Sequence, residues 1–188
     1  FMPGLVGRTN IGFDVQDTHE RYYDNPIIGD GSPAGRSYHY LYKRTSYTWN
    51  QILEYNKSFG KHNVNALVGH ENYAYKYNYL SGSRSEMNGD GITELPNFAT
   101  VLGTTSYENN RKIESYFTRV NYDFDQKYVL SASLRRDGNS RFHPDFRWEN
   151  FWSVGGAYNI EKEDFFNVPV VNQLKLRAAY GVVGNDGD

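Results

Sequence analysis

Ser115-Tyr-Phe-Thr-Arg-Val-Asn-Tyr-Asp-Phe124 is the stretch that decides the fold. Its even-numbered residues are mostly apolar, whereas its odd-numbered residues are mostly polar. Because successive side chains of a strand point to opposite faces, this period of two predicts a β-strand. The run Tyr128–Arg135 repeats the pattern after Asp125-Gln-Lys127, a short polar turn. The two runs together therefore predict a β-hairpin.

Alternation recurs along much of the chain. It is clear in Phe151–Ile160 and Gln173–Val182, and less regular in Asn10–Gln16, Tyr47–Asn56 and Asn63–Gly69. Gln173, Lys175 and Arg177 share one face of their run, and such groups cannot enter a dry core without partners. That face therefore requires water, a polar lumen or paired carboxylates.

The tyrosines at 73, 75, 77 and 79 take the opposite parity to the apolar residues just before them. Either a β-bulge or emergence of the strand from an apolar layer explains such a switch.

The connections between these runs alternate in length. Ser58–Lys61 and Asp125–Lys127 are tight, whereas Thr18–Ser37 and Ser81–Lys112 are long, with Asp137–Arg147 and Glu161–Asn172 between these extremes. About seven strands running up and down, with tight turns at one end and long loops at the other, are typical of outer-membrane barrels. A soluble β-sandwich or barrel with one wet face also alternates, so that alternative stays open.

Composition excludes several classes of protein. The 188 residues contain no Cys, which rules out a disulfide scaffold and a thiol enzyme. No apolar run approaches the ~20 residues of a membrane-crossing helix. A net charge of −2 gives no basic field for nucleic acid. The N-terminus has neither a signal peptide nor an initiating Met, so we expect a piece of a longer or processed polypeptide.

Several ordered blocks of sequence closely resemble one known family. They are Ser115–Phe124, Lys127–Phe142, Arg147-Trp148, Phe151–Tyr158 and Leu174–Asn185, with Tyr55–His62 and Asn65–Glu71 upstream. In this order they resemble the barrel of SusC/RagA-type TonB-dependent outer-membrane transporters.

The resemblance implies a Gram-negative outer-membrane β-barrel of about 22 strands with a plugged lumen. The whole chain, residues 1–188, would be part of the barrel domain, without the plug, the TonB box or the remaining strands. The family imports oligosaccharides or peptides, with a SusD-like surface lipoprotein as lid and the TonB–ExbB–ExbD complex as motor. The resemblance implies a transporter component and no enzyme, embedded in outer-membrane lipid.

Aromatic residues near the long loops are candidate cargo contacts, because rings stack on apolar sugar faces and the Tyr hydroxyl adds a hydrogen bond. These candidates are Tyr38, Tyr40, Tyr42, Phe98, Tyr107, Phe142 and Phe146. The alternative for each is packing within a loop or an interfacial girdle.

Charged and aromatic residues on the strands lead to two further predictions. The lumen-facing candidates are Arg119, Arg135, Lys175 and Arg177. These cations either line the path of polar cargo or form a ladder of ion pairs with Asp123, Glu149 and carboxylates of the plug. Trp148, Trp152, Tyr158 and Tyr180 are expected to anchor the barrel at the lipid interface. Arg135-Arg-Asp137 is expected to order the turn at Gly138-Asn-Ser140.

No catalytic, metal or cofactor site is expected. The five His, at 19, 39, 62, 70 and 143, lack ligand spacing, and Asn88-Gly-Asp-Gly91 lacks the later Glu of a calcium loop. No carboxyl pair marks a glycosidase. Two other functions remain open: a soluble secreted carbohydrate-binding β module, and an adhesin-like protein-binding barrel.

Overall fold

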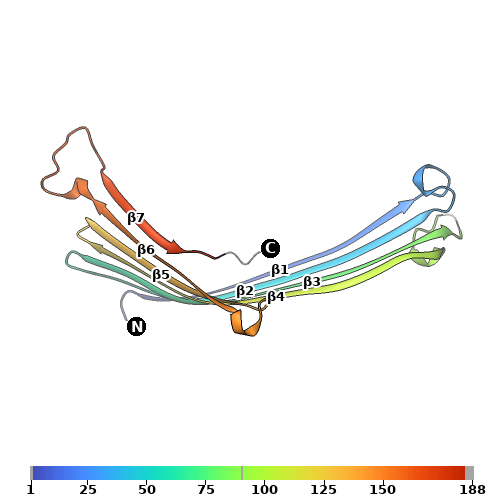
Figure 1. Ribbon diagram of the computed structural model, residues 1–188, viewed down its shortest axis with the longest axis horizontal. Helices are drawn as coiled ribbons and strands as arrows, with labels where there is room; N and C mark the ends of the chain where they lie inside the picture. Colours follow the sequence, from blue (N-terminus) through green and yellow to red (C-terminus); the bar gives the residue numbers. More distant parts are fainter. Residues whose placement is uncertain (1, 90, 185–188) are drawn as a thin grey trace. The chain divides into compact units, whose positions relative to one another are not determined.

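A single sheet of seven strands makes up the computed structural model, which describes residues 2–89 and 91–184 (Figure 1). The order β1-β2-β3-β4-β5-β6-β7 places each strand beside its neighbours in sequence. The strands are β1 (Leu5–Asp24), β2 (Arg36–Phe59), β3 (His62–Met87), β4 (Phe98–Phe124), β5 (Tyr128–Asn139), β6 (Trp148–Asn159) and β7 (Lys175–Val182). The predicted all-β, up-and-down fold is confirmed.

Short 3-10 helices occupy the connections. They are η1 (Gly29–Gly31), η2 (Leu95–Asn97), η3 (Pro144–Phe146) and η4 (Ile160–Lys162). Within residues 2–89 and 91–184, no helix has the length and apolar character needed to cross a membrane.

Two compact units divide the chain. Unit 1 consists of Phe1–Gly12, Thr48–Tyr73 and Lys112–Asp188, and unit 2 consists of Phe13–Tyr47 and Ala74–Arg111. The boundaries fall inside β1, β2, β3 and β4, whereas β5, β6 and β7 belong to unit 1. The change of parity at the tyrosines of β3 begins where that strand passes from unit 1 into unit 2, at Tyr73.

The predicted hairpin in unit 1 is confirmed. Antiparallel pairing places Phe124 opposite Tyr128, and Lys127 N donates to Phe124 O at 2.9 Å. Asp125 and Gln126 have φ of 53° and 57°. Two left-handed residues closed by this bond are typical of a type I′ turn, and residues 125–127 separate the paired Phe124 and Tyr128. The register of β4 and β5 is therefore set locally by the turn.

The two longest predicted loops are wrong, because much of each is strand. β1 continues to Asp24 and β2 begins at Arg36, which leaves 25–35 as the connection within 18–37. Likewise β3 continues to Met87 and β4 begins at Phe98. Backbone hydrogen bonds hold a ladder together whatever its side chains are. Strands that lack an apolar face therefore carry no period by which sequence analysis can detect them.

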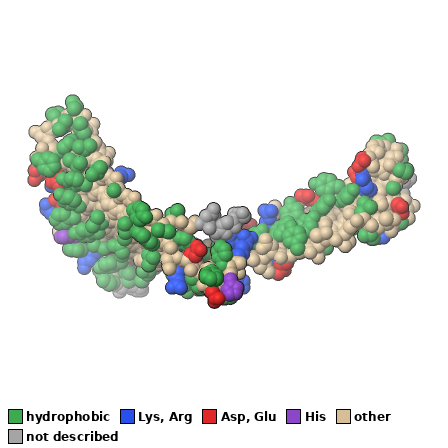
Figure 2. All heavy atoms as spheres, viewed as in Figure 1, with side chains coloured by type: hydrophobic (Ala, Val, Ile, Leu, Met, Phe, Trp, Pro, Cys, Tyr) green, Lys and Arg blue, Asp and Glu red, His purple; other side chains and the backbone are tan. Residues whose placement is uncertain are grey.

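The sheet encloses almost no core of its own. Among hydrophobic residues in the described part of the chain, Phe98 alone is buried. Many large apolar side chains are exposed instead, and in Figure 2 hydrophobic side chains gather over the region of β5, β6 and β7. A sheet of one layer needs another apolar medium or protein layer to cover such a face.

Candidate functional site

One face of unit 1 carries a continuous apolar strip. The register pairs Val120 with Ala132, Ala132 with Val154, and Val154 with Tyr180, so residues of one parity on four strands share this face. The strip comprises Tyr116, Thr118, Val120, Tyr122, Phe124, Tyr128, Leu130, Ala132, Leu134, Trp152, Val154, Tyr158, Leu176, Tyr180 and Val182. Tyr180 is 70% exposed. Monomeric soluble proteins rarely leave such a large apolar patch in water.

An aromatic cluster lies at one end of the strip, where tight turns connect β2 to β3 and β4 to β5. We call Phe59, His62, Phe124, Tyr128 and Tyr158 the turn-end belt. The rings of Tyr128 and Tyr158 stack at 5.0 Å, and those of Phe124 and His62 lie 4.9 Å apart. Phe59 stacks on His62 at 5.0 Å. Rings with one polar edge are typical of membrane–water interfaces.

A second aromatic cluster closes the strip near the β5–β6 loop. We call His70, Tyr116, Trp148 and Arg136 the loop-end belt. The ring of Tyr116 stacks on His70 at 4.8 Å and on Trp148 at 6.1 Å. The guanidinium of Arg136 lies 5.3 Å from the Trp148 ring centroid. The apolar strip is therefore bounded at both ends.

The spacing of the two belts along β6 can be compared with the apolar band of outer-membrane barrels. Trp148 and Tyr158 lie at opposite ends of β6. At a rise of about 3.3 Å per residue they are about 33 Å apart along the strand. For a strand tilted by about 40° this becomes about 25 Å along the membrane normal, the height of the apolar band on outer-membrane barrels.

The opposite face of unit 1 is polar and is organised around Arg135. Its guanidinium pairs with Asp137 at 2.7 Å and with Glu71 at 3.3 Å, donates to Ser115 Oγ at 2.9 Å, and lies over the Phe117 ring. The ladder expected with Asp123 and Glu149 is therefore wrong for this arginine. Fixed ion pairs of this kind hold charge on a face that water or polar cargo can reach.

The other predicted cations lie on the same polar face. Arg119 is opposite Ser133, Arg177 is opposite Ala157, and Lys175 is opposite Asn159. Asp123 accepts instead from Asn63 Nδ2 at 3.0 Å and from Gln126 N at 3.1 Å, which holds the β4–β5 turn.

A cavity of about 230 Å³ opens at the loop end of the polar face. Its lining includes Asp137, Asn139, Phe142, Arg147, Glu149 and Phe151. The Asn139 side chain accepts from Arg141 N, and Asn139 N donates to Arg147 O. The turn is thus ordered by Asn139, while Asp137, expected to help order it, binds Arg135 instead.

Unit 2 carries a different surface, a face rich in tyrosine. The rings of Tyr22 and Tyr40 meet edge to face at 5.8 Å, and Tyr77 contacts both Tyr42 and Tyr107. The Tyr42 hydroxyl donates to Glu20 at 3.2 Å. We call these residues, with Tyr38 and Tyr79, the tyrosine face.

A hollow of about 540 Å³ lies on this face. It is lined by Glu20, Tyr22, Asp24, Asp30, Arg36, Tyr38 and Tyr40. Arg36 pairs with Asp30 and Asp24, and its hydrogen bond to Asp30 is the main cause that raises the pKa of its guanidinium. The predicted contacts Tyr38 and Tyr40 therefore lie side by side in one open, polar site.

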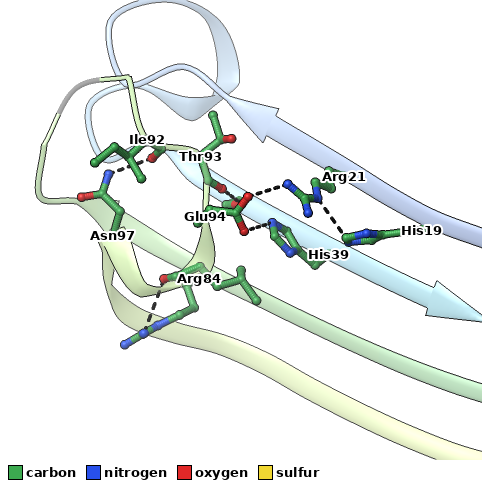
Figure 3. Close-up of polar contacts among 10 residues, drawn as sticks. His19, Arg21, His39, Arg84, Ile92, Thr93, Glu94 and Asn97 are labelled. Atoms are coloured by element: carbon green, nitrogen blue, oxygen red, sulfur yellow. Dashed lines mark hydrogen bonds and ion pairs between the residues drawn. The ribbon is translucent and has the colours of Figure 1, made fainter.

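The tip of the β3–β4 connection folds back onto β1 and β2 (Figure 3). Glu94 pairs with Arg21 at 2.5 Å and approaches His39 at 3.9 Å. Ser37 Oγ donates to Thr93 O at 2.6 Å, and Ser37 is buried. We call these contacts the loop latch. They join the β3–β4 connection to both β1 and β2.

Two predicted cargo contacts differ sharply in how much of the side chain is exposed. Phe98 is 0% exposed and packs against the Tyr23 ring, so it serves the packing of unit 2 and does not line an open surface. Phe146, in η3, is 75% exposed. No group of three or more His, Cys, Asp or Glu within the described residues is arranged to hold a metal ion.

Known proteins share this arrangement. No family model matches the chain. TonB-dependent receptor P3 of Formosa agariphila is 33% identical over 192 residues, covering 98% of this chain, and TonB-dependent receptor SusC of Bacteroides thetaiotaomicron is 29% identical over all of it. The solved RagAB peptide transporter superposes on 96% of the chain with a TM-score of 0.89 and 26% identity. The chain matches a barrel segment of SusC/RagA-type TonB-dependent receptors.

The SusC-like segment is short relative to these relatives. It covers 19% of both receptor P3 and SusC, and 21% of the RagAB chain that it matches. The likeness extends through residues 1–50, where the sequence carries no motif that is distinctive by itself.

Several residues of this SusC-like segment escaped sequence analysis. Glu71 and His70 lie far in sequence from Arg135 and Glu114, the groups that they contact. Parity alone could have placed Glu71 on the polar face, because it follows Asn63 and Asn65 on β3 by even steps. Its pairing with Arg135 across 64 positions depends on the register of the folded sheet.

Proposed function

We propose that this chain forms part of the wall and outer strands of a SusC-like, TonB-dependent nutrient importer in the Gram-negative outer membrane. One observation carries the proposal: an exposed apolar strip in unit 1 lies between two aromatic belts about 33 Å apart along β6, with charged residues on the reverse face. Lipid would cover the strip, and the polar face would line the plugged lumen.

The orientation follows from the connections. Outer-membrane barrels have short periplasmic turns and longer extracellular loops. The type I′ turn after Phe124 would therefore face the periplasm, and the connections 25–35 and 88–97 would face the outside. Trp148, Trp152, Tyr158 and Tyr180 would meet lipid or its interface.

The cargo would be an oligosaccharide or a peptide. SusC and the RagAB peptide transporter, both similar to this chain, support that range. Tyr38, Tyr40 and Tyr107 on the tyrosine face, with Phe142 in the cavity of unit 1, are the contacts we propose for it. Arg119, Arg135, Lys175 and Arg177 would line the lumen.

The partners follow from the same family. A SusD-like surface lipoprotein would lid the barrel, and TonB–ExbB–ExbD would move the plug. The role is transport and not catalysis. A soluble carbohydrate-binding module is the weaker proposal, because it would leave the apolar strip in water.

Spin labels on neighbouring residues of β5 test the membrane contact. Leu130→Cys and Ser131→Cys, made in the full receptor and labelled with a nitroxide, place probes on opposite faces of one strand. In reconstituted membranes we expect Leu130→Cys to collide readily with oxygen and poorly with a water-soluble nickel chelate, because lipid concentrates oxygen and excludes the chelate.

Ser131→Cys is the matched control and should show the weaker oxygen signal. Val154→Cys and Ser153→Cys on β6 repeat the test, since Val154 shares the apolar strip and Ser153 faces Ser133. Equal nickel accessibility on both faces would remove the membrane assignment.

A further inference from the structure

An open hollow of about 620 Å³ lies in unit 1, beside the loop-end belt. Its lining includes Gly7, Thr9, Leu53, Val68, His70 and Tyr116. A Cβ built on Gly7 would meet no atom within 4 Å, so the missing side chain leaves the floor open. Leu53 and Val68 are exposed and supply an apolar floor.

The rim of this hollow interrupts the apolar face with a chain of polar contacts. His70 Nδ1 lies 2.8 Å from Gln51 Oε1, and His70 Nε2 lies 3.2 Å from Glu114 Oε1. The Tyr116 hydroxyl donates to the same Glu114 oxygen at 2.7 Å. Polar groups on a lipid-facing surface are rare and usually functional.

On three strands the floor residue of the hollow lies closer to the tight-turn end of the sheet than the rim residue does. Gly7 lies two residues nearer the turn end than Thr9 on β1, Leu53 two residues nearer than Gln51 on β2, and Val68 two residues nearer than His70 on β3. The apolar part therefore points toward the middle of the strip and the polar part toward the loop-end belt. This is the head-to-tail polarity of a lipid in the outer leaflet.

A cation stands next to the rim. Arg136 pairs with Tyr116 across β4 and β5, is exposed, and lies over the Trp148 ring. Within the described residues, no carboxylate pairs with it. The one acid of the rim, Glu114, is already engaged by His70 and Tyr116. An anionic head group would complement this arginine.

We infer that the hollow binds one phosphate-bearing acyl lipid, with a chain on the floor at Gly7, Leu53 and Val68 and the phosphate at Arg136. The inference rests on the proposed membrane location, because only then does this face meet lipid. The lipid completes the apolar strip where Gly7 leaves a gap. It also supplies the counter-charge for Arg136.

Native mass spectrometry of the full receptor, titrated with palmitoyl-oleoyl phosphatidylglycerol, tests the site. Gly7→Leu fills the floor and Arg136→Gln removes the cation. Each should weaken the first lipid adduct about tenfold, the equivalent of about 1.4 kcal/mol. Arg136 is exposed, so that variant keeps the test valid if Gly7→Leu does not fold.

Two controls match these changes. Ala132→Leu adds bulk on the apolar strip outside the hollow, and Arg119→Gln removes an arginine from the polar face; both should leave the adduct within about twofold of the native receptor. Unchanged adducts in both test variants would overturn the site. The site would also be overturned if the test variants lost a peak at the mass of two receptors and kept the lipid adduct. The face would then bind a second copy of the receptor.

The nitroxide pair at Leu130 and Ser131 separates this inference from the proposed function. An intact accessibility pattern with unchanged lipid adducts rejects the lipid site alone. Equal accessibility on both faces rejects the membrane location and, with it, the lipid site.

Discussion

Units 1 and 2 share four strands but present different chemistry. In unit 1, β4 alternates apolar residues such as Val120 with polar ones such as Asn121, and the apolar face is exposed between aromatic belts. In unit 2 the same strand carries Tyr107 on a face of hydrogen-bonded phenols and carboxylates. Strand formation alone therefore does not distinguish the two units. The chemistry of the faces does.

A matched pair of valines on β4 gives the sharpest test of that difference. Val120→Arg in unit 1 should destabilise the full receptor by about 2–4 kcal/mol, because it places a charge near the middle of the apolar band. Val101→Arg in unit 2 should change stability by no more than about 0.5 kcal/mol. The two valines are 43% and 59% exposed, so burial within the protein does not separate them.

Denaturant unfolding in lipid vesicles measures both valine variants. Similar losses for the two would mean that unit 2 also needs an apolar medium, and the contrast between the units would fail.

The loop latch tests what holds the β3–β4 connection of unit 2 against β1 and β2. Ser37→Ala removes the hydrogen bond to Thr93 O and leaves a carbonyl without that donor, at a cost of about 1 kcal/mol. Amide hydrogen exchange in 88–97 should then accelerate about fivefold.

Ser106→Ala, on an exposed position of β4 in unit 2, is the control for the latch and should leave the exchange in 88–97 unchanged. An equal acceleration in both variants would show that the latch does not hold this connection.

The smallest expected effect lies in the connection between β6 and β7 of unit 1. Hydrogen bonds from Lys127 Nζ at 2.8 Å and Tyr128 at 2.7 Å lower the pKa of the Glu163 carboxyl. Because the pKa of Glu163 is lower in the folded state than in the unfolded state, its ionised carboxylate stabilises the fold when the pH is above the unfolded-state pKa. That stability is lost as the pH falls through the folded-state pKa.

Glu163→Gln should therefore lower the thermal midpoint slightly at neutral pH and remove this part of the acid dependence. Glu161→Gln in the same connection is the comparison. Thermal unfolding at neutral and acidic pH measures the two. A native acid response in Glu163→Gln would show that other carboxyls carry it.

Sequence analysis predicted unit 1 far better than unit 2. The period of two on β4 to β7 predicted the apolar and the polar face, because successive side chains of a strand point to opposite sides of the sheet. In unit 2 much of 18–37 and 81–112 was assigned to loops although β1 to β4 continue there, and Phe98 was taken for an exposed contact although it is buried.

By itself the sequence determined the strand faces, the hairpin after Phe124 and the likeness to SusC-type receptors. Each of these features depends on residues that are close together along the chain. Only the tertiary structure decided that Arg135 pairs with Glu71, that Glu94 holds its loop, and that Gly7 opens a hollow beside Tyr116. These contacts join residues separated by many positions. They depend on sheet register, which is the cumulative result of every turn and ladder between them.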